Sequence, residues 1–315
     1  MIVRWGLAEL DATLEEVGIE RPLVIASDRW RTLVMPNVAW WSEVPSVRVD
    51  VPADADGILA IGGGSAIDTG KHTSAETGLP VVHVPTTYSG AEWTTFYGVR
   101  SPDRVMRGGG AGARPVAIVY DVDLTLDLPR DQTAGTALNA LAHCAEALYA
   151  AGHNAAGDEQ ALLGAPLIAD ALPRVLADLS DRAAREELLR GAMHAGHALG
   201  LAGLALAHAM AQALGGTYGL PHGAMNALCL PPALRFNDRF VPDAVGRLGA
   251  AIGGDAVERS RELALLGGFE RLRDFGIPEQ DLPALAVATA QRGGNQANPR
   301  PATPAEILEL FQQIY

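Results

Sequence analysis

Two histidines, His208 and His222, begin and nearly end the stretch "HAMAQALGGTYGLPHG", and Gln212 stands one helical turn after the first. An earlier stretch, "ALNALAHCAEALYA", places Asn139 and His143 four residues apart, hence on one face of a helix. Imidazoles can bind a metal ion, transfer a proton or hold a substrate, whereas a single histidine on an Ala- and Leu-rich helix usually packs in a core. Two such pairs converging on one site favour binding or catalysis, so these five residues are the candidate catalytic set.

The other histidines give weaker signals. His194 and His197 lie three residues apart on an intervening helical stretch, where they form a second and weaker candidate pair. We assign structural or surface roles to the remaining three, His72, His83 and His153.

The glycine-rich stretch "AIGGGSAIDTGKHT" indicates a phosphate site. Its candidate residues are Gly62, Gly63, Gly64, Ser65, Asp68 and Lys71, the last being the only lysine among 24 basic residues. Glycines let a phosphate approach the backbone, Ser65 can cap the helix that follows, and the first N–H groups of that helix attract an anion. The spacing matches neither G-x-G-x-x-G nor G-x-x-x-x-G-K-[ST], so a plain strand-to-helix turn is the alternative.

A hydroxyl-rich stretch, "VPTTYSGAEWT", follows the next apolar run and contains Thr86, Thr87 and Ser89. Ligands of open α/β sheets bind at the carboxyl ends of parallel strands, where this stretch would lie. By itself it equally fits a turn stabilised by hydroxyl groups. Two such loops after two strands favour a shared ligand site.

The first part of the chain alternates apolar runs with turns marked by Gly and Pro, a pattern typical of a parallel sheet buried on both faces. The expected strands cover residues 22–27, 57–64, 80–87 and 115–121. Later segments are rich in Ala and Leu over helical lengths. We therefore expect an α/β domain at residues 1–128 and an all-α domain at residues 129–315.

Two connections in the first domain are unusual. Only the four residues "ADAD" separate the run 44–52 from the expected strand 57–64, where parallel neighbours need a crossover helix. Either these two strands are not neighbours or a helix is missing. The stretch "GGGAGARP", residues 108–115, is expected to be a mobile loop or a plain linker.

Composition excludes several classes of protein. A net charge of −13 argues against a nucleic acid or an anionic membrane as the main partner. The two cysteines, Cys144 and Cys229, lie in apolar surroundings that suit reduced core thiols. The beginning of the chain has no signal-peptide pattern and no other stretch reads as a membrane span, so we expect a cytoplasmic protein.

Six stretches, taken in order, resemble the iron-containing (group III) alcohol dehydrogenase superfamily, and within it the maleylacetate reductases. They are "GGGSAIDTGK", "PTTYSGAEWT", "LDLP", "NALAHCAEALYA", "HAMAQALGGTYGLPHG" and "NPRPAT". The resemblance covers nearly the whole chain. It implies a dehydroquinate synthase-like fold with an N-terminal nicotinamide-nucleotide domain, a helical C-terminal domain and a homodimer.

The resemblance also implies roles in binding NAD(P). Residues Gly62–Gly64, Ser65 and Asp68 would hold the diphosphate, with Lys71 supporting that loop, and three hydroxyl groups would line the same ligand, those of Thr86, Thr87 and Ser89. Asp28 matches the acidic residue that bonds the adenosine ribose. A carboxylate there repels a 2′-phosphate and favours NAD, although Arg29 beside it leaves NADP as the alternative.

Metal-dependent members of the superfamily hold their ion on one Asp and three His. The matching positions in this chain are Asn139, His143, His208 and His222. An amide in place of the carboxylate leaves the charge of the ion uncompensated, so we expect no metal, in line with the maleylacetate reductases. Two further departures are Gln212 and Pro232, which stand where these groups usually carry histidines. A Gln can hydrogen-bond but cannot deliver a proton near neutral pH.

We therefore predict a NAD(H)-dependent, metal-independent reductase of an unsaturated or 2-oxo carboxylic acid related to maleylacetate. The three histidines would orient the substrate, Asn139 and Gln212 would donate hydrogen bonds, and Arg235 or Arg300 would pair with a carboxylate. The departures leave a non-redox dehydratase, lyase or cyclase as the alternative. A non-enzymatic sensor ranks last, because buried polar groups without partners cost stability.

Overall fold

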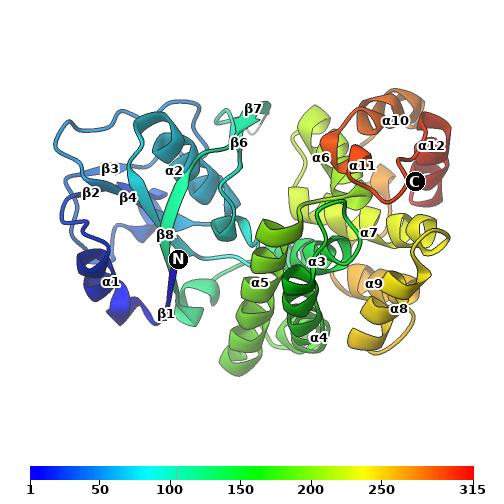
Figure 1. Cartoon of the computed structure of the whole chain (residues 1–315), viewed down its shortest axis with the longest axis horizontal. Helices are drawn as coiled ribbons and strands as arrows, with labels where there is room; N and C mark the ends of the chain where they lie inside the picture. Colours follow the sequence, from blue (N-terminus) through cyan, green and yellow to red (C-terminus); the bar gives the residue numbers. More distant parts are fainter. Residues whose placement is uncertain (104) are drawn as a thin grey trace. The chain divides into compact units, whose positions relative to one another are not determined.

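The computed structural model describes residues 1–103 and 105–315. The chain forms two compact units (Figure 1). The first contains residues 1–87 and 91–127, and the second contains residues 88–90 and 128–315. The segment Tyr88–Gly90 therefore belongs to the helical unit, although it lies within the hydroxyl-rich stretch.

The first unit is built on a six-stranded parallel sheet with the order β1-β8-β5-β4-β2-β3. The strands are β1 (Ile2–Trp5), β2 (Pro22–Ile25), β3 (Ala39–Trp41), β4 (Gly57–Gly62), β5 (Pro80–Pro85) and β8 (Arg114–Tyr120). Every residue of β2 and β4 is buried, as continuous apolar runs in a parallel sheet require. The sequence-based prediction of a parallel α/β unit is confirmed.

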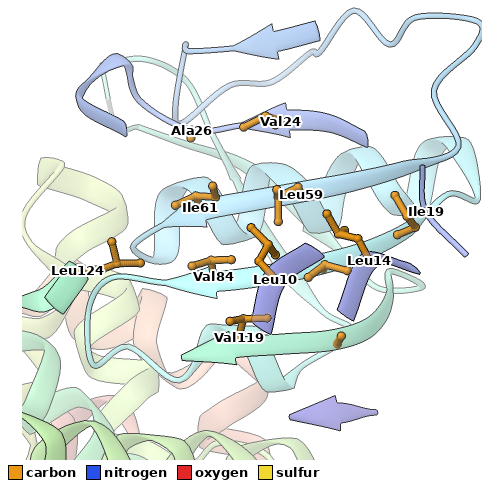
Figure 2. Close-up of a cluster of buried hydrophobic side chains, with 12 residues drawn as sticks. Leu10, Leu14, Ile19, Val24, Ala26, Leu59, Ile61, Val84, Val119 and Leu124 are labelled. Atoms are coloured by element: carbon orange, nitrogen blue, oxygen red, sulfur yellow. The ribbon is translucent and has the colours of Figure 1, made fainter. Parts of the chain in front are cut away.

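Alternate strand residues form two cores, one on each face of the sheet. Val24, Leu59 and Val84 lie on the face covered by α1 (Leu10–Glu16), together with Leu10 of that helix (Figure 2). Residues of the opposite phase pack with Ile67 of α2 (Gly64–Thr77). The period of two along each strand thus covers both faces with apolar side chains and fixes the register of the sheet.

Both alternatives hold for the short connection before β4. The run 44–52 forms no strand, and β4 pairs with β2 and β5 instead. The strand that precedes β4 in the chain is β3, which pairs with β2 at the edge of the sheet. Residues 42–56 contain neither helix nor strand, so the crossover helix is also absent from this described segment.

The expectation of a mobile loop or plain linker at residues 108–115 is wrong for residues 108–110 and 114–115, which belong to strands, and only residues 111–113 are irregular. The first three glycines of this stretch belong to β7 (Met106–Gly110), which pairs antiparallel with β6 (Tyr97–Arg100). Glycine has little intrinsic preference for a strand, so the partner strand decides the conformation. A Cβ atom at Gly109 would lie 2.8 Å from the carbonyl oxygen of Tyr97, which explains the need for glycine there.

The second unit is helical, as predicted. Its helices are α3 (Arg130–Ala147), α4 (Ala155–Ala177), α5 (Arg182–Ala202), α6 (Leu206–Tyr218), α7 (His222–Asp238), α8 (Pro242–Ala251), α9 (Ala256–Leu266), α10 (Leu282–Ala290), α11 (Gly293–Gln296) and α12 (Pro304–Gln313). Short 3-10 turns complete the chain at Leu7–Glu9, Asp28–Trp30, Ala91–Trp93, Val122–Thr125, Leu272–Phe275 and Glu279–Asp281.

Small residues let these helices approach closely. A Cβ atom at Gly164 of α4 would lie 2.9 Å from the carbonyl oxygen of Gly191 on α5.

Among the described helices, α4 is long and apolar enough to span a membrane by length and composition. Half of its apolar window is buried within the protein, and helices in soluble cores pass the same test.

Candidate active site

Three helices of the second unit bring the predicted catalytic residues together. Asn139 and His143 lie one turn apart on α3, and His208 lies in the first turn of α6. Helix α6 ends at Gly219, whose φ of 66° suits glycine, and α7 begins three residues later at His222. This short turn explains why His208 and His222 approach one another although 13 residues separate them in the sequence.

The three imidazoles form a row with His208 in the middle. The rings of His143 and His208 stack with centroids 4.7 Å apart and an interplanar angle of 15°. The rings of His208 and His222 lie 5.6 Å apart and are tilted by 51°. Asn139, His143 and His208 are buried, whereas His222 is partly exposed.

Glu146 is a site residue that the sequence-based selection missed. Its carboxylate is fully buried and lies 2.7 Å from Nδ1 of His208, with further hydrogen bonds from the backbone N–H groups of Ala205 and His208 at 2.8 and 3.2 Å. A carboxylate in this position orients the ring and fixes a proton on Nδ1. Nε2 is then the nitrogen of His208 that can act on a ligand.

Asn226 is the second missed residue. It lies one turn after His222 on α7 and is fully buried. Its Nδ2 group donates a hydrogen bond to Oδ1 of Asn139 at 2.7 Å and lies 3.0 Å from Nε2 of His222. The sequence does contain a signal, because a single Asn interrupts the apolar run "AMNALCL" at helical spacing from His222.

Four polar atoms around this cluster are buried without a hydrogen-bond partner among the described residues. They are Nδ1 of His143, Nε2 of His208, Oδ1 of Asn226 and Oγ of Ser89. Buried polar groups are normally hydrogen-bonded, so unpartnered atoms at one place indicate where a polar ligand or water binds. Burial, followed by the proximity of His208 and His222, holds the pKa of His143 well below its usual value and keeps this ring neutral.

The remaining predicted substrate-binding residues do not join this cluster in the described contacts. Gln212 is partly exposed on α6, one turn after His208. Arg235 lies 3.6 Å from Glu258, and Arg300 pairs with the carboxylate of Glu306. Both arginines therefore have carboxylate partners in the protein, and the pairing of one of them with substrate stays a prediction. Pro232 is buried within α7.

The other histidines and the cysteines have structural surroundings. Nδ1 of His194 lies 2.8 Å from Oε1 of Gln160, away from the catalytic set in the described contacts, and His197 is also partly buried on α5. Burial on strand β5 lowers the pKa of His83 to about 3. His72 contacts the carbonyl of Val47, and His153 is exposed.

Cys144 and Cys229 are free, buried thiols whose pKa is raised by burial.

The glycine loop of the first unit lies between β4 and α2, at the carboxyl end of the strand. Gly62 has a φ of 146°, which favours glycine, and a Cβ atom there would lie 2.8 Å from Cβ of Ala66. Helix α2 begins at Gly64 with Gly63 as its N-cap residue. The N–H groups of Ala66 and Ile67 donate to the carbonyl oxygen of Gly63, so the N–H groups that precede them at the start of this 14-residue helix are the ones that can bind a diphosphate.

Two predicted details of this loop change. Ser65 does not cap the helix, because the helix has already begun at Gly64 and no side chain bonds to its first N–H groups. Lys71 is 1% exposed, and its Nζ atom lies 2.7–2.8 Å from the oxygens of Ala91, Thr94 and Phe96. These bonds, with the nearby carboxylate of Asp68 at 2.8 Å, fix α2 to the segment 91–96. The ammonium group therefore supports this segment.

The hydroxyl-rich stretch follows β5, the neighbour of β4 in the sheet. Thr86 is buried, and its N–H group donates to the carbonyl oxygen of Gly62. Oγ1 of Thr87 is buried without a partner among the described residues, and Thr87 faces the glycine loop at Gly63. A nicotinamide dinucleotide fits these residues, because a side chain at Gly62 or Gly63 would fill the cradle and Thr87 has a hydroxyl group to offer.

Asp28 lies after β2, in the 3-10 turn Asp28–Trp30, and its side chain is exposed. Its carboxylate accepts a hydrogen bond from Nε of Arg31 at 2.6 Å. Arg29, which the sequence places beside it, instead stacks on the ring of Trp30. The guanidinium group relevant to this carboxylate is thus that of Arg31.

The histidine cluster offers a divalent metal ion no free carboxylate among the described residues. The four positions that match metal ligands in the superfamily that the sequence resembles carry an amide and three imidazoles. The one carboxylate of the cluster, that of Glu146, already accepts hydrogen bonds from His208 and two backbone N–H groups. Oδ1 of Asn139 already accepts from Asn226. Within the described residues, no group of three or more His, Cys, Asp or Glu side chains is arranged to hold a metal ion.

Replacing Gly63 by alanine is expected to weaken NADH binding without unfolding the first unit. The new Cβ atom would lie 2.8 Å from Cγ2 of Thr87 and would push this side chain out of place. Because such overpacking costs about 1–3 kcal/mol, the dissociation constant should rise about 10- to 100-fold, measured by isothermal titration calorimetry. Gly246→Ala is the control, since nothing lies within 4 Å of its Cβ position. Equal affinities in both variants would contradict the assignment.

The sequence and structure can now be compared with known proteins. The family profile "Fe-containing alcohol dehydrogenase family, C-terminal" matches residues 133–315, and the profile "Iron-containing alcohol dehydrogenase" matches residues 48–122. The chain belongs to the iron-containing alcohol dehydrogenase family, and it is an oxidoreductase.

Relatives within this family include maleylacetate reductases. The chain is 37% identical over 281 residues to the maleylacetate reductase of Sphingobium indicum, which covers 86% of this chain and 78% of that protein. It is 34% identical over 330 residues to the enzyme of Pseudomonas knackmussii, which covers 98% and 93%. The crystal structure of maleylacetate reductase from Rhizobium sp. strain MTP-10005 has a TM-score of 0.87 at 28% identity and covers 100% of this chain and 95% of that one.

Proposed function

We propose that this oxidoreductase is a NAD(H)-dependent reductase that works without a metal ion on an unsaturated or 2-oxo carboxylic acid related to maleylacetate. The observation that carries the proposal is the amide at Asn139, whose oxygen and nitrogen are both engaged with neighbouring groups. Asn139 thus offers the histidine cluster hydrogen bonds at the position where a bound ion would need a carboxylate. The names of the relatives favour reduction over the non-redox alternative.

The first unit would bind the cofactor. The loop Gly62–Gly64 and the N-terminus of α2 would hold the diphosphate, and Thr86 and Thr87 would offer hydroxyl groups, as would Ser89, which belongs to the second unit. When bound, NADH supplies a hydride. Asp28 would bond the adenosine ribose, and its negative charge favours NAD. NADP is the alternative, since Arg31 lies at hydrogen-bonding distance from this carboxylate and could face a 2′-phosphate.

The second unit would bind the substrate. His143, His208 and His222 would orient its carbonyl and carboxylate groups, and Nε2 of His208 is one of the buried atoms with no partner among the described residues. A positively charged imidazole would offset the negative charge that develops on the substrate oxygen. Asn139 and Gln212 would contribute hydrogen bonds. The protein would act in the cytoplasm as a homodimer, with neither nucleic acid nor membrane as a partner.

Mixing the purified protein with NADH and maleylacetate tests this proposal. We expect NADH absorbance to fall at the same rate with and without EDTA, and added Zn²⁺ or Fe²⁺ to give no increase. A rate that needs added metal would overturn the metal-independent part. NADH that binds but is consumed with neither maleylacetate nor related enones and 2-oxo acids would overturn the reductase assignment. NADPH in parallel assays decides the choice of cofactor.

A further inference from the structure

A chain of hydrogen bonds runs from one backbone carbonyl through two amides. The carbonyl oxygen of Ser89 can only accept, so Asn139 must present its Nδ2 group to it, at 3.1 Å. Oδ1 of Asn139 then faces Asn226, which must present Nδ2 in turn, at 2.7 Å. One carbonyl group therefore fixes the orientation of both amides.

Each amide nitrogen has a second hydrogen, and each lies near an imidazole. Nδ2 of Asn139 is 3.3 Å from Nε2 of His143, and Nδ2 of Asn226 is 3.0 Å from Nε2 of His222. An imidazole nitrogen that accepts a hydrogen bond is the one without a proton, so the neutral rings carry their proton on Nδ1. The amides thus use the lone pairs with which these two rings would otherwise bind an ion.

We propose that Asn226 is a positioning residue of this reductase, which directly and through Asn139 holds the imidazoles of His222 and His143 in one tautomer and one orientation. The amide pair performs the task that a bound ion would perform. The role of these rings in reduction rests on the proposed function. The position of Asn226 supports the inference, because a fully buried amide one turn after His222 is costly unless its N–H groups are bonded, and Nδ2 of Asn226 has both of these partners.

The Asn226→Leu variant tests the inference in the whole enzyme. Leucine has a similar volume but donates to neither Asn139 nor His222, so both rings lose a constraint. We expect kcat to fall about 10- to 100-fold, as for other residues that orient a catalytic ligand, with the KM for NADH unchanged. Asn226→Ser retains one donor and is expected to lose less, which keeps the test available if the leucine variant folds poorly.

Asn237 is the matched control on the same helix. It is also fully buried and pairs with another amide, that of Asn298, at 3.0 and 2.7 Å, without contacting the histidine row. Asn237→Leu should lower the melting temperature and leave kcat per folded molecule unchanged. A merely structural effect of removing a buried amide would appear equally in both variants.

A second readout does not need activity. Long-range ¹H–¹⁵N spectra of protein labelled with ¹⁵N-histidine report the tautomer of each ring, assigned with His143→Gln and His222→Gln variants. We expect the proton on Nδ1 of both rings in the unsubstituted protein, and mixed tautomers for His222 in Asn226→Leu. A proton on Nε2 of either ring in the unsubstituted protein would overturn the inference.

The two proposals fail separately. If the protein consumes NADH with substrate but Asn226→Leu retains kcat within about twofold, the positioning role is wrong and the proposed function stands. If the protein consumes NADH with none of the substrates, the proposed function is wrong. The tautomers of His143 and His222 then decide whether the amide pair orients these rings.

Discussion

His208→Ala is expected to lower kcat for substrate reduction by about 10²- to 10⁴-fold, the range that general acid–base groups contribute, with NADH affinity unchanged. His208 is the middle ring of the row, it stacks on His143, and Glu146 contacts its Nδ1 atom and orients it. Its Nε2 atom has no partner among the described residues and is the nitrogen left for the substrate. Stopped-flow and steady-state assays with NADH measure the loss.

His153→Ala is the control for this prediction, because His153 is exposed and lies outside the cluster. Removing His208 also leaves the buried Glu146 with only its two backbone donors, which costs about 1–3 kcal/mol of folding free energy. His208→Gln therefore belongs in the same experiment, since a glutamine can still donate a hydrogen bond but no proton near neutral pH. Full activity in the glutamine variant would show that His208 transfers no proton.

Asn139→Asp is expected to create a metal site. Aspartate supplies the missing negative charge, still accepts from Asn226, and no longer donates to the Nε2 lone pair of His143. Two opposite unit charges about 4 Å apart attract by about 4 kcal/mol at the effective dielectric constant of a protein, and Zn²⁺ carries two charges, so its affinity should rise by at least roughly 10³-fold. Elemental analysis of the dialysed variant should find close to one Zn²⁺ per chain.

Asn237→Asp is the control for this gain in zinc affinity. Like Asn139→Asp it introduces a buried carboxylate, but the new carboxylate lies on α7, away from the histidine row. Zinc should raise the melting temperature of Asn139→Asp and leave that of Asn237→Asp unchanged. Tight zinc binding by the unsubstituted protein would contradict both this prediction and the metal-independent proposal. If reduction by Asn139→Asp required zinc, this one residue would decide between metal-dependent and metal-independent reduction.

The fold was largely predictable because its signals are local. Continuous Val, Ile and Leu runs mark strands buried on both faces, and Ala- and Leu-rich segments of helical length mark the second unit. The strand β7 was not predictable, because three glycines carry no preference for a strand and β6 decides their conformation. The same applies to the edge strand β3, whose three residues follow a polar and Pro-marked segment.

The site was predictable only where residue type carries the signal. Histidine side chains can bind ligands and transfer protons, so His143, His208 and His222 could be selected from their residue type and spacing. Glu146 could not, because an acid on a helix normally faces solvent and only packing against α6 shows its role. It does lie at i+7 from Asn139, on the same helical face, and this spacing could have raised it as a candidate.

The surroundings of Lys71 also determine how this protein reacts with amine-directed reagents. The chain has no other lysine, and this one is 1% exposed with oxygen atoms on several sides of its ammonium group. An acylating reagent reaches the Lys71 side chain only when α2 separates from the segment 91–96. The rate of acylation at this single side chain therefore measures how often the first unit opens, a quantity that is usually inaccessible in proteins with many surface lysines.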